Sequence, residues 1–103
     1  MTHSTYKLKI PGDTAHLIRT LHPEIKKKIR AGLKAIILDP AAGKALKDEL
    51  AGLRSFRVGR FRIIYRVGRN VIELVAVGPR EQIYEETYRL LKKEGQDLEE
   101  KLK

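Results

Sequence analysis

The chain has 103 residues, no cysteine, and 22 basic against 13 acidic residues, which gives a formal net charge of +9 at pH 7. This length predicts one domain with a modest core, and the lack of cysteine excludes disulfides, thiolate catalysis and cysteine metal sites. The charge favours nucleic acid, an acidic protein or, more weakly, an anionic membrane surface as partner. We expect no membrane span, because no apolar run approaches roughly 20 residues. The N-terminus also lacks the apolar core of a signal peptide, so we expect a cytoplasmic protein.

The first part of the chain predicts a short strand and two helices. Tyr6, Leu8 and Ile10 alternate with lysines, as in a strand. Pro11-Gly12-Asp13 follows, and Asp13 is placed to cap a helix that runs through Leu21. A second helix is predicted to begin at Pro23 and to end at Asp39-Pro40, with lysines over much of its outer surface. Its apolar stripe has helical spacing and consists of Ile25, Ile29, Leu33, Ile36 and Ile37.

The second part of the chain predicts three strands and a last helix. Residues 41–53 form a connector with one helical turn near 45–50, and strands follow at about 54–58, 60–67 and 71–77. Gly68-Arg69-Asn70 suits a tight hairpin. The strand at 71–77 is apolar on both faces apart from Glu73, which predicts a central position. A helix is expected at about 81–94, and residues 95–103 are expected to be a mobile or partner-dependent tail.

These elements predict one α+β domain over residues 1–103, with its core at about 4–94 and the order β-α-α-β-β-β-α. We expect a small, largely antiparallel sheet of four strands. An N-terminal helical hairpin packs against the sheet, and a C-terminal helix completes the domain.

The strand at 60–67 carries an arginine stripe. Its apolar side chains alternate with arginines, interrupted only by Ile64, and residues 51–72 contain six arginines and no acid. Either acids elsewhere in the chain neutralise these arginines, or an absent anionic partner explains them. The second interpretation is favoured, because 13 acids cannot neutralise 22 bases and a guanidinium suits phosphate or carboxylate. The predicted phosphate-binding residues are Arg54, Arg57, Arg60 and Arg66.

Several chemistries find no support in the sequence. His3, His16 and His22 have no ligand spacing and no carboxylate partner, so we expect neither a metal site nor a cofactor. No nucleophile elbow or phosphate-binding glycine loop is present. Glu81, Glu85 and Glu86 are explained by the positive end of the last helix.

The remaining candidate group is Arg62, Arg80 and Tyr84. Arg80 and Tyr84 are four residues apart and therefore share a helical face that follows the central strand. Tyr84 could stack on a base or transfer a proton, or it could simply pack at the edge of the core with its hydroxyl in water. The residues alone leave these interpretations open.

Three separated blocks of the sequence resemble the RelE/ParE toxins of type II toxin-antitoxin systems. The first block is Leu53-Arg54-Ser55-Phe56-Arg57-Val58-Gly59-Arg60-Phe61-Arg62-Ile63-Ile64-Tyr65, the second is Val75-Ala76-Val77-Gly78-Pro79-Arg80, and the third is Tyr84. The first strand, the basic helices and the Asp39-Pro40 turn also match in order, so the resemblance covers about residues 4–90.

The resemblance implies a toxin with a small RNase-like fold that an antitoxin, often acidic, wraps and inhibits. In the RelE branch such toxins enter the ribosome and cleave the mRNA codon in the A site. The ribose 2′-hydroxyl attacks the adjacent phosphate without a metal. Carried over, Arg62 and Arg80 would stabilise the phosphate in the transition state, and Arg80 would also favour the tyrosine's phenolate. Tyr84 would transfer a proton or stack on a base.

Two departures from the pattern affect the assignment. RelE toxins often carry a lysine pair before the arginine strand, where this chain has Leu53 and Ser55. The basic residues here are Arg54 and Arg57, and an arginine stays protonated and is a poor general base. The resemblance therefore does not identify the general base. Many relatives have His where this chain has Pro79. The alternatives are a ParE-like inhibitor of DNA gyrase and a nucleic-acid-binding domain without catalysis. An arginine followed at four residues by a tyrosine favours the RelE branch.

Overall fold

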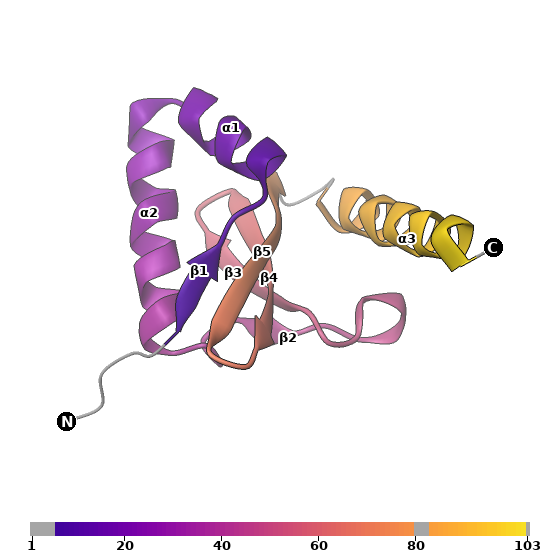
Figure 1. Cartoon of the computed structure of the whole chain (residues 1–103). Helices are drawn as coiled ribbons and strands as arrows, with labels where there is room; N and C mark the ends of the chain where they lie inside the picture. Colours follow the sequence, from indigo (N-terminus) through magenta and orange to yellow (C-terminus); the bar gives the residue numbers. More distant parts are fainter. Residues whose placement is uncertain (1–5, 80–82, 103) are drawn as a thin grey trace.

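The computed structural model describes residues 6–79 and 83–102, and the side chains of the last helix as far as Lys92. Arg80 and Glu81 therefore lie outside the described residues. Figure 1 shows the described elements in chain order. They are β1 (Lys7–Lys9), α1 (Gly12–Thr20), α2 (Pro23–Leu38), β2 (Lys44–Ala45), the 3-10 helix η1 (Asp48–Leu50), β3 (Arg54–Val58), β4 (Phe61–Gly68), β5 (Val71–Pro79) and α3 (Ile83–Leu102).

The sheet has the strand order β1-β5-β4-β3-β2, and only β1 and β5 pair in parallel. The α+β class and the largely antiparallel sheet are as predicted, and β5 lies inside the sheet between β1 and β4. The described sheet has five strands, so the predicted count of four is wrong. The additional strand is β2, whose Lys44 and Ala45 pair with Ser55 and Arg54 of β3. Two residues carry no detectable period, and β2 is a strand because of its pairing.

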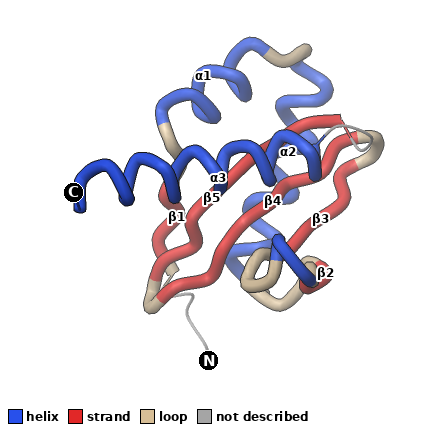
Figure 2. The backbone as a smooth tube through the Cα atoms, turned by 90° about the vertical axis from the view of Figure 1, so that its right-hand side faces the viewer, coloured by secondary structure: helices blue, strands red, loops and turns tan. Residues whose placement is uncertain are grey.

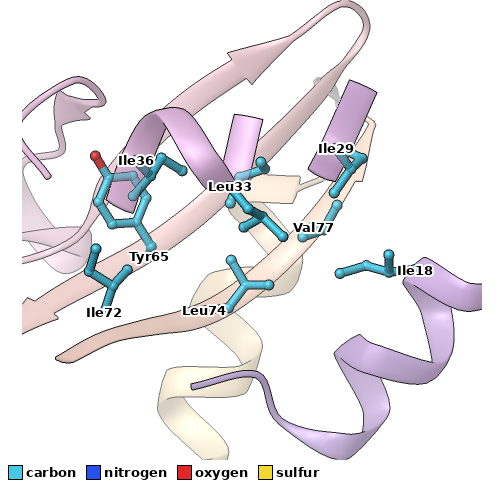
Figure 3. Packing of buried hydrophobic residues seen from close by; sticks show 9 residues of the cluster. Ile18, Ile29, Leu33, Ile36, Tyr65, Ile72, Leu74 and Val77 are labelled. Carbon is cyan, nitrogen blue, oxygen red and sulfur yellow. The ribbon is translucent and has the colours of Figure 1, made fainter. Parts of the chain in front are cut away.

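The sheet separates two apolar clusters. The hairpin of α1 and α2 covers one face, and α3 crosses the other, as Figure 2 shows from the α3 side. Figure 3 shows side chains of the hairpin and of the sheet meeting in the larger cluster, which includes Ile29, Ile36, Tyr65 and Leu74. Under α3 the smaller cluster contains Leu53, Ile64, Ala76 and Ile83. Ile64 therefore interrupts the arginine stripe because it belongs to the second core.

Several predicted boundaries need correction. Asp13 makes no cap hydrogen bond, and Pro11 is the N-cap of α1. The expected helical turn near 45–50 is divided between β2 and η1. β4 begins at Phe61, so Arg60 lies in the turn before it. The last helix, predicted to end near Glu94, continues to Leu102. Pro23 does begin α2, as predicted, and the ring of His22 accepts a hydrogen bond from the backbone of Glu24.

A β-bulge lies in the middle of the β4–β5 ladder. Ile64 pairs with Ala76, but the next residue, Tyr65, pairs with Leu74. Val75 is therefore an additional residue of β5. Beyond the bulge Arg66 faces Glu73, and the guanidinium of Arg66 donates a hydrogen bond to the Glu73 carboxylate within an ion pair.

Gly32 sets the distance between α2 and the sheet. It is buried, and a Cβ at this position would lie 2.8 Å from Val58 Cγ2 and 3.2 Å from Ile63 Cδ1. We expect Gly32→Ala to lower the free energy of unfolding by about 1–3 kcal/mol, because this part of the core is already filled. Urea unfolding measures the change. Gly12→Ala is the control, since a Cβ there meets nothing within 4 Å. Equal stability of the two variants would contradict the packing argument.

Candidate functional site

The candidate site lies on the α3 side of the sheet, where β3 and β4 run side by side. Arg57 of β3 is directly opposite Arg62 of β4, and Ser55 is two residues before Arg57. Residues two apart on a strand share a face, so Ser55, Arg57 and Arg62 belong to the same surface. Opposed like charges destabilise a sheet unless something else compensates. This pair of arginines therefore favours an anion at this surface.

Arg62 and Tyr84 meet at Ser55. The Nη1 group of Arg62 donates a hydrogen bond to Ser55 Oγ at 3.3 Å, and the hydroxyl of Tyr84 lies 3.3 Å from the same oxygen. The guanidinium carbon of Arg62 is 5.7 Å from the centre of the Tyr84 ring, within the range of a cation–π contact. Within the described part of the chain, Nε of Arg62 is buried and has no hydrogen-bond partner. The three residues thus form one contact cluster.

The start of α3 is placed by a glycine. Gly78 pairs with Arg62 across the β4–β5 ladder. A Cβ on Gly78 would lie 3.0 Å from Ile83 Cδ1, so the missing side chain lets Ile83 reach the sheet. Ile83 is fully buried in the smaller cluster, and Tyr84 packs at the margin of that cluster. This packing explains how Tyr84 is brought to Ser55.

The structure divides the predicted arginines between different surroundings. Arg54 pairs with Tyr65, and its Nη2 donates to the carbonyl of Ala41 on the hairpin side of the sheet. There it lines a cavity of about 340 Å³, apart from the Arg62 cluster. Arg54 therefore lies on the opposite face of the sheet from Arg62 and Tyr84. Arg60 is exposed in a turn, and Arg66 is paired with Glu73. Their role in binding phosphate stays a prediction.

Ser55 is the member of the cluster that the sequence did not single out. It is buried, and the sequence offers no signal that a buried serine bridges two other residues. Arg80, the third predicted catalytic residue, lies outside the described residues. No group of His, Asp and Glu in the described residues could hold a metal ion. None of the described helices has the length and hydropathy needed to cross a bilayer.

The same fold occurs in solved structures of toxins. The toxin–antitoxin complex RelBE2 from Mycobacterium tuberculosis is similar at 25% identity, with a TM-score of 0.65 over 73% of this chain and 98% of that chain. The archaeal RelE–RelB complex from Pyrococcus horikoshii has 23% identity and a TM-score of 0.62, over 76% and 98%. A mutant of the E. coli toxin RelE in the free state has 19% identity and a TM-score of 0.69, over 86% and 96%.

The fold and the family match place the chain in the class of small α+β toxins of toxin-antitoxin systems. The family model described as "ParE toxin of type II toxin-antitoxin system, parDE" matches residues 9–84, and the chain belongs to this family within the RelE/ParE superfamily. No curated protein matches the chain in sequence. The resemblance expected from the sequence is confirmed.

Proposed function

We propose that this toxin is an endoribonuclease that cleaves mRNA in the ribosomal A site and so inhibits translation. The observation that carries the proposal is the cluster of Arg62, Ser55 and Tyr84 on the arginine-bearing face of the sheet. In the reaction, the ribose 2′-hydroxyl loses its proton and its oxygen bonds to the adjacent phosphorus. The bond from phosphorus to the 5′-oxygen breaks, and that oxygen takes up a proton. The products are a 2′,3′-cyclic phosphate and a 5′-hydroxyl.

Arg62 is suited to the developing charge on the phosphate. A guanidinium stays protonated and donates through a planar fork, so it can bind two phosphate oxygens at once. Its contacts with Ser55 and the Tyr84 ring hold it in place before the substrate arrives, which is the arrangement that stabilises a transition state most. Arg57 is positioned to contact a neighbouring phosphate. Arg80 is proposed to add a second guanidinium to the reacting group.

Tyr84 is assigned the proton transfer, with base stacking as the alternative role. Its hydroxyl is already within reach of the cluster at Ser55, and its ring is partly exposed beside Arg62. Proton transfer by a positioned side chain requires such a hydrogen-bonding oxygen near the reacting groups. Stacking requires the ring alone. A substitution that removes the oxygen and keeps the ring therefore separates the two roles.

An antitoxin is the proposed protein partner. The relatives from M. tuberculosis and P. horikoshii were both solved as toxin–antitoxin complexes. The formal charge of +9 favours an acidic antitoxin segment that covers the basic surface. Ribosome and mRNA are the proposed targets, which places the activity in the cytoplasm.

Inhibition of DNA gyrase through protein binding is the second candidate. It is favoured by the family model, whose description names ParE toxins. In that case the arginine face would be a docking surface, and the cluster around Ser55 would have no chemical step to perform. A supercoiling assay with purified gyrase tests this candidate directly.

We expect Tyr84→Phe to lower the rate of mRNA cleavage by on the order of 10² or more, because it removes the hydroxyl and keeps the ring. Primer extension on a defined mRNA in a reconstituted translation system shows the cuts and their position. Tyr88→Phe is the matched control, since Tyr88 lies one turn further along α3, is partly exposed and contacts Lys92. Arg80→Ala is measured in parallel and should also lose cleavage.

Three outcomes separate the assignments. Cuts within the A-site codon that fade in Tyr84→Phe support an RNase with proton transfer by Tyr84. Cleavage by Tyr84→Phe at the rate of the wild type would leave only stacking for this residue. Intact mRNA with wild-type toxin, together with inhibited supercoiling, would replace the proposed RNase by a gyrase inhibitor.

A further inference from the structure

Ser55 has surroundings that are unusual for a serine on a strand. It is only 3% exposed, and it is one of two buried polar or charged residues in the described part of the chain. The other is Thr87, whose hydroxyl donates to the carbonyl of Ile83 within its own helix. Ser55 instead contacts two side chains from elsewhere in the fold, Arg62 of β4 and Tyr84 of α3. A buried hydroxyl without a partner is costly, so these contacts stabilise one another.

The donor and acceptor chemistry gives the contacts a direction. A guanidinium only donates, so Ser55 Oγ accepts the hydrogen bond from Arg62 Nη1. The single proton of Ser55 is then available for the oxygen of Tyr84, which lies 3.3 Å away. Serine can also accept a second bond, so it can serve the tyrosine oxygen in either protonation state. The hydrogen bonds therefore run from the guanidinium of Arg62 to the hydroxyl of Ser55 and from that hydroxyl to the phenol oxygen of Tyr84.

We propose that Ser55 is a positioning residue, which holds the Arg62 guanidinium and the Tyr84 hydroxyl at fixed places relative to each other. This inference rests on the proposed function, because it assigns a purpose to the fixed geometry of Arg62 and Tyr84. Ser55 is too buried to meet the substrate and acts through its two neighbours. The serine hydroxyl is a short and neutral bridge between the two groups.

The cleavage rate tests the proposal through a double-mutant cycle. We expect Ser55→Ala to lower the single-turnover rate by about 10- to 100-fold with little change in the concentration for half-saturation, because the reacting groups lose their alignment. Ser55→Thr keeps the hydroxyl and should restore most of the rate. In the Tyr84→Phe background, Ser55→Ala should lower the cleavage rate by a much smaller factor than in the wild type, since the effects of residues that act together are not additive.

A matched control separates positioning from general stability. Thr87→Val removes the other buried hydroxyl at nearly the same volume, and it should lower the stability without lowering the rate of the folded protein. If Ser55→Ala lowered the cleavage rate by the same factor with and without the Tyr84 hydroxyl, the proposal would be overturned. Wild-type rates in Ser55→Ala would do the same.

A spectroscopic measurement keeps the inference testable without cleavage. The guanidinium N–H signals of Arg62, assigned with Arg62→Lys, report whether rotation of the group is hindered. We expect hindered rotation in the wild type and in Thr87→Val, and faster rotation in Ser55→Ala. If the wild type cuts no mRNA but these signals behave as expected, Ser55 positions Arg62 and the RNase assignment fails. Equally free rotation in the wild type and Ser55→Ala would overturn the positioning role whatever the activity.

Discussion

Arg62→Ala should cleave mRNA about 10²–10³ times more slowly than the wild type, because it removes a fixed charge-stabilising donor from the transition state. The guanidinium of Arg62 is held by Ser55 and by the ring of Tyr84, and its buried Nε has no partner among the described residues. The hydrogen bond to Ser55 uses Nη1 alone, so Nη2 still has N–H donors that phosphate oxygens can use. Single-turnover cleavage on programmed ribosomes measures the loss.

Arg66→Ala is the matched control for this prediction. The substitution lies on the same strand and removes the same charge, but the Arg66 guanidinium is already paired with Glu73. We expect its cleavage rate to stay within about threefold of the wild type, because Glu73 already neutralises this guanidinium. A larger loss would support the phosphate-binding role that the sequence predicts for Arg66. Equal losses in the two variants would mean that total charge, rather than the Arg62 cluster, governs cleavage.

Tyr65→Ala should lower the free energy of unfolding by about 3–5 kcal/mol, the range expected when a large buried side chain is truncated. The Tyr65 ring is fully buried next to the end of α2, and its side chain is shown among the core residues in Figure 3. Its hydroxyl donates to the carbonyl of Pro40 at 2.7 Å and accepts from the backbone N–H of Gly43 at 2.9 Å. Since a small domain has a total stability of about 5–15 kcal/mol, this variant is at risk of unfolding.

Tyr65→Phe separates the hydroxyl from the ring. It keeps the packing and leaves two backbone groups without their partner, so we expect a loss of about 1–3 kcal/mol in urea unfolding. Tyr88→Phe provides the comparison at a partly exposed tyrosine and should be close to neutral. Wild-type stability of Tyr65→Phe would show that the hydroxyl does not hold the connector after α2 in place.

The sequence predicted the elements whose apolar pattern repeats over enough residues to be detected. The apolar stripe of α2 and the run of β5, apolar apart from Glu73, led to the correct position of both, and the alternation around Ile63 and Tyr65 led to β4. It did not predict β2, which exists through its pairing with β3. Nor did it predict the length of α3, because the sequence after Glu94 shows only a weak apolar pair.

The candidate site was predictable by residue type and less so by geometry. Arg62 and Tyr84 were singled out from the sequence, and the structure brings them into contact. Which face an arginine takes follows from the two-residue alternation along its strand, but the sequence alone does not show which face the helical hairpin covers or which residues lie across from each arginine. Arg54 faces the hairpin, and Arg66 meets an acid that lies just beyond the acid-free stretch of residues 51–72.

The β-bulge at Val75 makes the charge uneven along the face of the sheet that α3 crosses. If the ladder continued regularly beyond the Ile64–Ala76 pair, Val75 would pair with Tyr65, and Glu73 would lie opposite Val67 instead of Arg66. With the bulge, Glu73 meets Arg66 and lies 3.9 Å from the amine of Lys9, so the acid offsets the cations at one end of the face. At the other end, Arg57 and Arg62 form no ion pair with an acid in the described part of the chain. Among the described residues, the bulge thus leaves this face more positive near Arg57 and Arg62 than near Glu73.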